Sequence, residues 1–342
     1  RGRAMGVGRE LYCRYMYVDD ILVAYSNDVE NEIERLYLCL ENVFEYRNLG
    51  DVSYYLGIQI ERNTNGIFSI FQTTKIKEML KKFKLEDMKI TKVPMHIDYM
   101  KNTIHSKCLP NNTLYHEAIG ALLYLSTTTR PDIASAVGIL CRKVKAPTVC
   151  DWNAVKDVFR YLKGTLDFKL KLQASQDLKL VGFSDADWGG DMYDRKSTSG
   201  FLFTLGDSSV SWMSKKQSTV ALSSTEAEYI SLCNASEEAM WLSNLLQDFQ
   251  IFNDTEPVKI FEDNQSCIAM LKSEKVNQRS KHIDIKYHYI KHLFKENKID
   301  VLYCPTEEMI ADVFTKPLSS TKFVMNRMKL KLIQGGSFEE GC

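Results

Sequence analysis

The stretch LKLVGFSDADWGGDMYDRKSTSGFLFTLGDSSVSWMS, residues 178–214, decides how the second half of the chain folds. It holds three apolar runs, 178–184, 199–205 and 209–214, and polar segments rich in glycine and aspartate separate them. Apolar runs of this length that are bounded by turn residues predict strands. Strands that follow one another without a helix between them pair antiparallel. The stretch therefore predicts three antiparallel strands in one sheet.

Helices and two further strands are predicted downstream of this sheet. A long helical pattern is followed by shorter strands and helices, at 225–249, 258–262, 265–271, 283–294, 299–303 and from 307 to about 314. Strands that alternate with helices join a sheet in the parallel direction. The last domain is thus expected to be a mixed five-stranded sheet covered by helices.

The first half of the chain has α+β character. Two runs rich in tyrosine and valine, 11–18 and 21–25, flank Asp19 and Asp20, so a β-hairpin with both aspartates at its tip is predicted. Further patterns predict a strand at 54–61 and helices at 31–44, 73–83, 115–126, 131–144 and 152–163. The polar run 173–177 marks a domain boundary.

Composition narrows the class of protein. With 342 residues, 44% hydrophobic and 26% charged, the chain is expected to form two or three folded domains. Its 44 basic and 44 acidic side chains balance, so any nucleic-acid surface must come from local clustering. Nine cysteines without a C-x-x-C pair argue against a zinc ribbon and favour a reducing compartment, and no apolar run approaches the roughly 20 residues of a membrane helix. A cytoplasmic protein is expected, and the initial Arg-Gly-Arg suggests a fragment or a processed product.

Four acidic residues stand where predicted elements of the last domain end or meet. Asp185 closes its first strand and Asp263 its fourth, while Glu228 lies in the first turn of the long helix and Asp312 on the last helix. Carboxyl ends of neighbouring strands converge on one sheet edge. Clustered carboxylates need a hard divalent cation, and two magnesium ions about 3.5–4 Å apart can promote phosphodiester hydrolysis. A two-magnesium nuclease site is therefore a hypothesis.

Each carboxylate also has an ordinary explanation. Asp185, Asp263 and Asp312 fit polar residues at strand ends or on a solvated helix face. Glu228 fits a capping box that starts at Thr225. Ser223 and Glu226 have the same spacing, which would leave Glu228 free to bind a metal.

Five strings resemble the ribonuclease H domain of copia-type retrotransposons: SDADWGGDMYDRKSTSGFLF (184–203), SWMSKKQSTVALSSTEAEYISL (211–232), FEDNQSCIAM (261–270), SKHIDIKYHYI (280–290) and VLYCPTEEMIADVFTKPL (301–318). The resemblance implies a ribonuclease H fold that cuts the RNA strand of an RNA–DNA hybrid. It also implies two Mg²⁺ ions, with Mn²⁺ as the alternative, on the carboxylates that match Asp185, Glu228, Asp263 and Asp312. The family's location is the cytoplasmic retrotransposon particle, with the nucleus as the alternative.

Upstream strings resemble the copia reverse transcriptase. YVDDILVA (17–24) is similar to the palm hairpin whose aspartates, here Asp19 and Asp20, bind metal ions, and NLGDVSYYLGIQIER (48–62), YHEAIGALLYLSTTTRPDIASAV (115–137) and WNAVKDVFRYLKGT (152–165) resemble the segments that follow it. The resemblance implies contact with template and primer. The family's third aspartate lies on an earlier palm strand that would precede residue 1, so nucleotide addition is not expected. Many other ribonucleases H carry a histidine on a loop shortly before the last aspartate, where it serves product release. Residues 304–308 of this chain contain no histidine, so that role is not expected here.

Together these patterns predict four regions: a truncated reverse transcriptase palm and thumb portion (1–98), a helical connection (99–175), a ribonuclease H domain (176–318) and a C-terminal tail (319–342). The expected function is hybrid-directed RNA cleavage within a Pol polyprotein, with other parts of that polyprotein as partners. One alternative is a catalytically silent nucleic-acid-binding remnant. Another is a subunit that completes its fold with a second chain.

Two further sets of residues give weaker predictions, one of a metal site and one of nucleic-acid contacts. Asp284, His288 and His292 stand one helical turn apart, which suits a transition metal but better suits a polar helix face, and His282 fits a surface position. Lysines interleaved with aromatic residues at 75–92 and 272–298 suit contact with a nucleic-acid backbone, and a solvated helix face explains them equally well.

Overall fold

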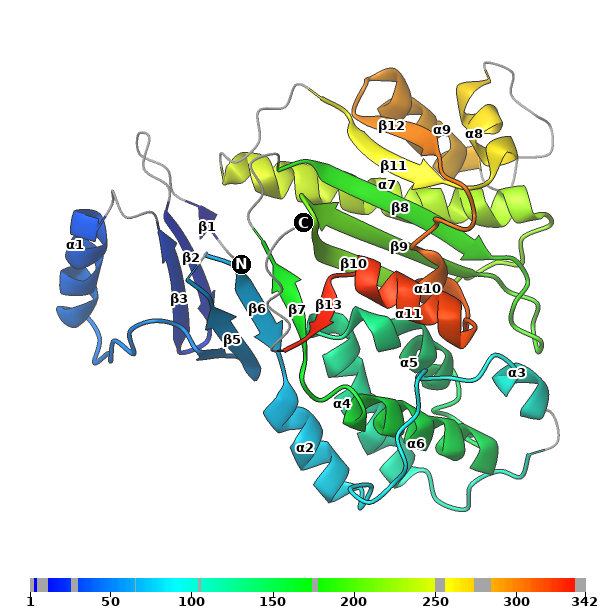
Figure 1. Cartoon of the computed structure of the whole chain (residues 1–342). Coiled ribbons are helices and arrows are strands. Elements are labelled where there is room, and N and C mark those ends of the chain that lie inside the picture. Colours follow the sequence, from blue (N-terminus) through cyan, green and yellow to red (C-terminus); the bar gives the residue numbers. More distant parts are fainter. Residues whose placement is uncertain are drawn as a thin grey trace.

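The computed structural model holds three sheets with helices packed around two of them (Figure 1). Strands β1 to β3 form a small sheet on one side of the molecule, and two five-stranded sheets lie in the main body. The structure describes residues 3–4, 12–25, 30–64, 66–103, 106–173, 178–249, 256–273 and 284–335.

One five-stranded sheet is the mixed sheet predicted for the ribonuclease H-like domain. Its order is β10-β9-β8-β11-β12, with antiparallel pairing of β8, β9 and β10 and parallel pairing of β11 with both β8 and β12. These strands are β8 Leu180–Asp187, β9 Thr198–Leu205, β10 Ser208–Lys216, β11 Val258–Glu262 and β12 Ile299–Tyr303. The predicted fold class and strand directions are confirmed.

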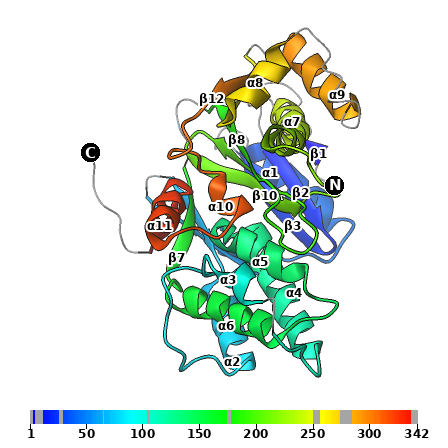
Figure 2. The same cartoon turned by 90° about the vertical axis from the view of Figure 1, so that its right-hand side faces the viewer.

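Helices cover both faces of this sheet (Figure 2). On one side lie α7 (Ser224–Asp248), α8 (Gln265–Lys272) and α9 (Asp284–Lys295), and on the other lie α5 (Ala134–Cys141) and α10 (Asp312–Thr315). Strand β9 shows why its sequence is apolar throughout: Phe201 and Phe203 belong to the core under α7, whereas Leu202 between them belongs to the core on the α5 side. A strand buried on both faces loses the alternation of polar and apolar residues.

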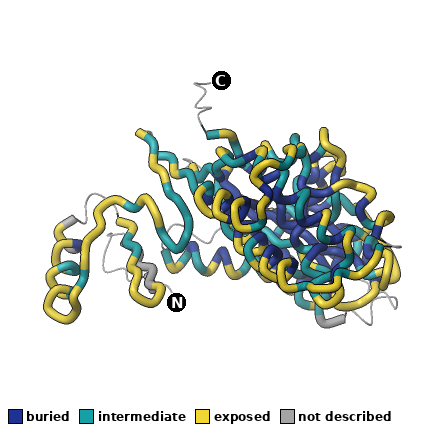
Figure 3. Tube along the Cα trace, turned by 90° about the horizontal axis from the view of Figure 1, so that it is seen from below, coloured by how far each residue is buried: buried dark blue, intermediate teal, exposed yellow. Residues whose placement is uncertain are grey.

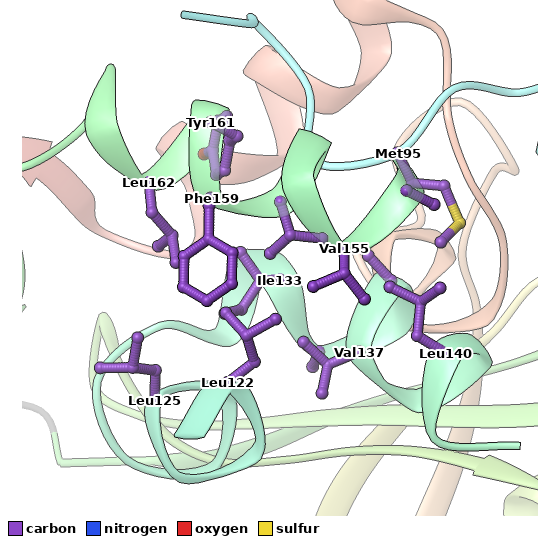
Figure 4. Close-up of a cluster of buried hydrophobic side chains, with 14 of the residues drawn as sticks. Met95, Leu122, Leu125, Ile133, Val137, Leu140, Val155, Phe159, Tyr161 and Leu162 are labelled. Atoms are coloured by element: carbon purple, nitrogen blue, oxygen red, sulfur yellow. The ribbon is translucent and has the colours of Figure 1, made fainter. Parts of the chain in front are cut away.

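The helical connection packs directly against the second face. It consists of α3 (Tyr99–Asn102), α4 (Thr113–Thr128), the 3₁₀ turn η2 (Pro131–Ile133), α5 and α6 (Val149–Lys163), with α2 (Thr73–Lys82) beside it. A capping box between Thr148 and Asp151 starts α6. Its core, drawn in Figure 4, also includes Leu202 of the sheet and Phe314 of α10. The helical connection and the mixed sheet with its helices therefore share one core.

The second five-stranded sheet was only partly predicted. Its order is β13-β7-β6-β5-β4, and every neighbouring pair is antiparallel. The strands are β4 Tyr54–Tyr55, β5 Ile58–Arg62, β6 Phe68–Phe71, β7 Phe168–Leu172 and β13 Leu332–Gln334. Within the expected tail, 319–342, the structure has α11 (Ser320–Lys329) and β13. Strand β13 joins the end of the described chain to segments from its first half.

The N-terminal hairpin has the predicted form. Strands β2 (Tyr12–Tyr17) and β3 (Asp20–Tyr25) pair antiparallel, and Val18 and Asp19 make the turn between them, with a φ of 52° at Val18. Strand β1 (Arg3–Ala4) extends the sheet, and α1 (Glu30–Glu41) follows. The described side chains of this unit are mostly exposed, and Figure 3 shows it beside the more deeply buried main body.

Three predicted elements differ from the structure. The strand predicted at 54–61 is divided into β4 and β5, and the helix predicted at 131–144 is the 3₁₀ turn η2 followed by α5, which ends at Cys141. The helix expected from residue 307 begins only at Asp312, and turns precede it. Met309 and Ala311 are both buried in one small cluster with Cys304. Residues two apart face different sides of a helix, so turns bring Met309 and Ala311 into one cluster more readily than a helix would. None of the described helices combines the length and apolar character needed to cross a membrane.

Candidate metal centre

Three of the four predicted carboxylates meet at one edge of the mixed sheet. Asp185 lies near the end of the central strand β8, Asp263 directly follows β11, and Glu228 lies in the first turns of α7. One carboxylate oxygen from each residue lies within 4.8 Å of the others. Parallel pairing of β8 with β11 aligns the carboxyl ends of both strands, which brings the two aspartates together.

The start of α7 leaves Glu228 free for this site. Ser223 is the N-cap residue and accepts a hydrogen bond from the Glu226 amide at 3.2 Å. The Glu226 carboxylate accepts one from the Leu222 amide at 2.8 Å. Ser223 and Glu226 thus make the capping interactions, as the second sequence alternative predicted.

Asp312 lies outside the group of three and is held by lysines. Its side chain is fully buried; Lys316 Nζ lies 2.6 Å from its Oδ1, and Lys322 pairs with its Oδ2. Thr315, in the same short helix, donates a hydrogen bond to the Asp185 carboxylate. The structure thus places Asp312 next to the group through α10, and its role as a metal ligand stays a prediction.

The site is electrostatically strained without a cation. Burial raises the pKa of Asp185 to about 7, and the Asp312 and Asp263 carboxylates add to the rise, while Lys316 and Thr315 oppose it. Burial also raises the pKa of Glu228 well above its usual value, with further increases from Glu262 and Asp185. Clustered acids whose protonated forms are favoured offer a place where positive charge would be stabilising.

Glu262 is a neighbour that the sequence reasoning missed. It is fully buried, accepts a hydrogen bond from the Asn264 amide at 3.1 Å, and its pKa is raised well above the usual range, chiefly by burial. The sequence did hold a signal for this burial. Residues of β11 alternate between the two faces of the strand, and Glu262, directly before Asp263, stands at a position that faces the interior. With Asp185 and Asp263, it is the third acidic group in the surroundings of Glu228.

The residues present fit a hard divalent cation. All three grouped side chains offer carboxylate oxygens, the ligands that Mg²⁺ prefers. Glu228 is 6% exposed, and its Oε2 has no hydrogen-bond partner within the part of the chain that the structure describes. Buried polar atoms rarely lack partners, so this oxygen is suited to a ligand.

Comparison with known proteins shows the family. Residues 3–97 match the family model described as reverse transcriptase (RNA-dependent DNA polymerase). The sequence is 35% identical over 315 residues to the Retrovirus-related Pol polyprotein from transposon TNT 1-94 of Nicotiana tabacum, covering 90% of this chain and 23% of that protein. It is 31% identical over 231 residues to the putative transposon Ty5-1 protein YCL074W of Saccharomyces cerevisiae, covering 66% of this chain and 72% of that one. The chain belongs to the copia-type retrotransposon Pol family.

This copia-type Pol chain thus spans about a quarter of the length of the tobacco polyprotein. Among solved structures, the crystal structure of LC11-RNase H1 in complex with RNA/DNA hybrid is 18% identical, with a TM-score of 0.31, and the match covers 40% of this chain and 94% of that one.

The remaining predicted site residues of the copia-type chain lie elsewhere. Asp19 and Asp20 are exposed at the tip of the N-terminal hairpin, and they belong to no group of three possible metal ligands among the described residues. His292 pairs with Glu296 at 3.4 Å on an exposed helix face. The Asp284 side chain, His282 and much of the lysine-rich stretch 272–298 lie outside what the structure describes.

Proposed function

We infer that this copia-type Pol chain is a ribonuclease H-type endonuclease that cuts the RNA strand of an RNA–DNA hybrid. The observation that carries the proposal is the convergence of Asp185, Glu228 and Asp263, from three separate elements, together with a buried Glu228 oxygen that has no hydrogen-bond partner among the described residues. The substrate follows from the family: DNA synthesis on an RNA template, the activity named in the matching family model, produces such a hybrid.

Asp185, Glu228 and Asp263 would hold Mg²⁺, and Mn²⁺ is the alternative with the same ligand preference. A second ion would extend the centre to Asp312. The bound cation would stabilise the negative charge that develops on a phosphodiester during hydrolysis. Thr315 orients Asp185, and Thr306 donates a hydrogen bond to Asp263 at 2.8 Å. The chain would distinguish the RNA strand from the DNA strand by contacts to the RNA 2′-hydroxyls across the minor groove of the hybrid.

The N-terminal part would hold template and primer without adding nucleotides. Asp19 and Asp20 lie together at the hairpin tip, and two-metal chemistry needs more ligands than this pair. The remaining Pol regions would be the protein partners, and the cytoplasmic retrotransposon particle would be the location, with the nucleus as the alternative.

The test is cleavage of an end-labelled RNA–DNA hybrid by the full chain, with Mg²⁺ and with a chelator. Cleavage is expected only with the ion. Asp263→Asn should lower it by about two or more orders of magnitude, because it removes a charged ligand from a centre that stabilises the transition state. Asp207→Asn is the matched control. Asp207 is exposed at the turn between β9 and β10, so this variant should cleave the hybrid as fast as the parent does.

Two results would reject the assignment. Asp263→Asn with unchanged cleavage would remove Asp263 from the centre. A parent chain that binds the hybrid but cuts nothing with Mg²⁺ or Mn²⁺ would favour the catalytically silent, nucleic-acid-binding alternative. Thermal unfolding of all three proteins separates loss of chemistry from loss of fold.

A further inference from the structure

Asp312 is neutralised from inside the protein. Lys316 follows α10 directly, and its ammonium group lies 2.6 Å from Asp312 Oδ1. Lys322, on the first turn of α11, pairs with Oδ2 and also donates to the Thr306 carbonyl at 3.2 Å. Both oxygens of a fully buried carboxylate therefore already face a cationic group.

The backbone that carries Asp312 has little freedom to move. Helix α10 presses against β9 at Gly200, where a Cβ would lie 2.8 Å from the side chains of both Phe314 and Thr315. Thr315 is also tied to Asp185 by its hydrogen bond. A change in what binds Asp312 must therefore come from the lysine side chains rather than from a shift of the helix.

Lys316 is placed to affect the whole centre. Besides Asp312, its ammonium interacts electrostatically with Asp185 and Asp187. Its side chain is 37% exposed, so it can leave Asp312 for solvent or for a phosphate group. The three grouped carboxylates differ from Asp312 in their ion pairs: among the described residues Asp312 pairs with Lys316 and Lys322, whereas Asp185, Glu228 and Asp263 pair with no lysine.

We propose that Lys316 acts as a built-in cation that competes with a second divalent ion for Asp312. Without nucleic acid, the chain then binds one divalent ion, at Asp185, Glu228 and Asp263, and the Asp312 side is occupied by the ammonium group. An ammonium and a divalent ion on one buried carboxylate repel each other strongly at such distances. The inference rests on the proposed metal centre and adds to it a residue that sets how many ions are bound.

The experiment is Mn²⁺ binding to the full chain without nucleic acid, followed by electron paramagnetic resonance and calorimetry. The parent should bind one ion. Lys316→Met should bind a second, with the affinity of that site raised about tenfold or more, because the ammonium group on Oδ1 is gone and only Lys322, on Oδ2, remains. Lys316→Gln should behave in the same way, and Lys316→Arg, which keeps the charge, should still bind one ion.

A double variant locates the second ion. Lys316→Met with Asp312→Asn should return to one ion if Asp312 is its ligand. Two ions of similar affinity on the parent, or one ion on folded Lys316→Met and Lys316→Gln, would overturn the competition while leaving the proposed nuclease intact. Failure of the parent to bind any Mn²⁺ would instead reject the metal centre itself.

Discussion

Asp185 makes the stability of the metal-free protein depend on pH. Its pKa is about 7 in the folded chain, chiefly because it is buried, and near 4 in an unfolded chain. Between these values the folded state holds a proton that the unfolded state has released, so stability falls as pH rises through that window. Each pKa unit corresponds to about 1.4 kcal/mol.

We therefore expect the melting temperature, measured with a chelator, to fall between about pH 5 and pH 7. Asp185→Asn should make this slope shallower without abolishing it, because burial also raises the pKa of Glu228 and Glu262. Mg²⁺ should reduce the slope in the parent, since a cation stabilises the ionised carboxylates. A chelated parent with a flat profile would contradict the electrostatic account.

The buried ion pair Arg130–Asp132 should contribute far more to the stability of the fold than exposed ion pairs do. Arg130 Nη2 lies 2.8 Å from Asp132 Oδ2, both side chains are almost fully buried, and Arg130 also donates to Thr165. Arg130→Met leaves a buried carboxylate without its cation, so a loss of about 3–5 kcal/mol is expected by chemical denaturation. Lys101→Met, which breaks an exposed pair with Asp98, should cost at most about 1 kcal/mol. Equal costs for the two variants would contradict this reading.

At the level of residues, the sequence was informative where local geometry decides. Strand ends and capping spacing were enough to bring Asp185, Glu228 and Asp263 to one place and to separate Glu228 from the capping role of Glu226. The partner of Asp312 could not be predicted, because the Lys316 side chain is long and its direction depends on how α10 packs.

Gly200 should be essential for the position of α10. Alanine there must displace Phe314 and Thr315, so we expect destabilisation of about 1–3 kcal/mol and weaker hybrid cleavage, since Thr315 orients Asp185. Gly120→Ala is the matched control: a Cβ at this site in α4 meets nothing within 4 Å, and alanine should stabilise the helix by up to about 1 kcal/mol. Denaturant unfolding and cleavage rates check both variants. A tolerated Gly200→Ala would show that α10 can shift.

Long, strongly patterned elements were predictable and short ones were not. The expected helix at 225–249 appears as α7, Ser224–Asp248, with both ends within one residue. Strands β6 and β7 were missed, although Phe168–Leu172, FKLKL, alternates as a strand should. With only four and five residues, their existence depends on pairing with each other and with β13, which local pattern does not reveal.

The main body should unfold as one unit. Its largest core cluster runs from Ile76 to Leu330 and joins the connection to α10 and α11. Leu330→Ala should cost about 2–5 kcal/mol because Leu330 is fully buried, and should displace a single transition seen by fluorescence and circular dichroism alike. Met328→Ala, in the last turn of α11 and two residues before Leu330, should have little effect because Met328 is 63% exposed. Two separate unfolding transitions, of which Leu330→Ala shifts only one, would contradict a shared core.

The four predicted regions were drawn from composition and local pattern, and such signals mark where a linker lies rather than what packs against what. Residues 173–177 are polar, yet the segments on either side of them meet again: Trp212 donates a hydrogen bond to the Ser126 carbonyl at 2.7 Å, and Arg142 donates one to the Thr198 hydroxyl at 3.0 Å. Contacts between residues so far apart in sequence are a property of the folded molecule.

Strand β13 has a consequence for the order of events during synthesis. Residues 168–172 emerge from the ribosome long before residues 332–334, which complete their sheet edge. Until then β7 exposes unpaired amide and carbonyl groups, the kind of edge that recruits other chains. The nascent protein is therefore expected to remain dependent on chaperones until translation has passed this strand, and pairing over such sequence distance makes the closing step slow.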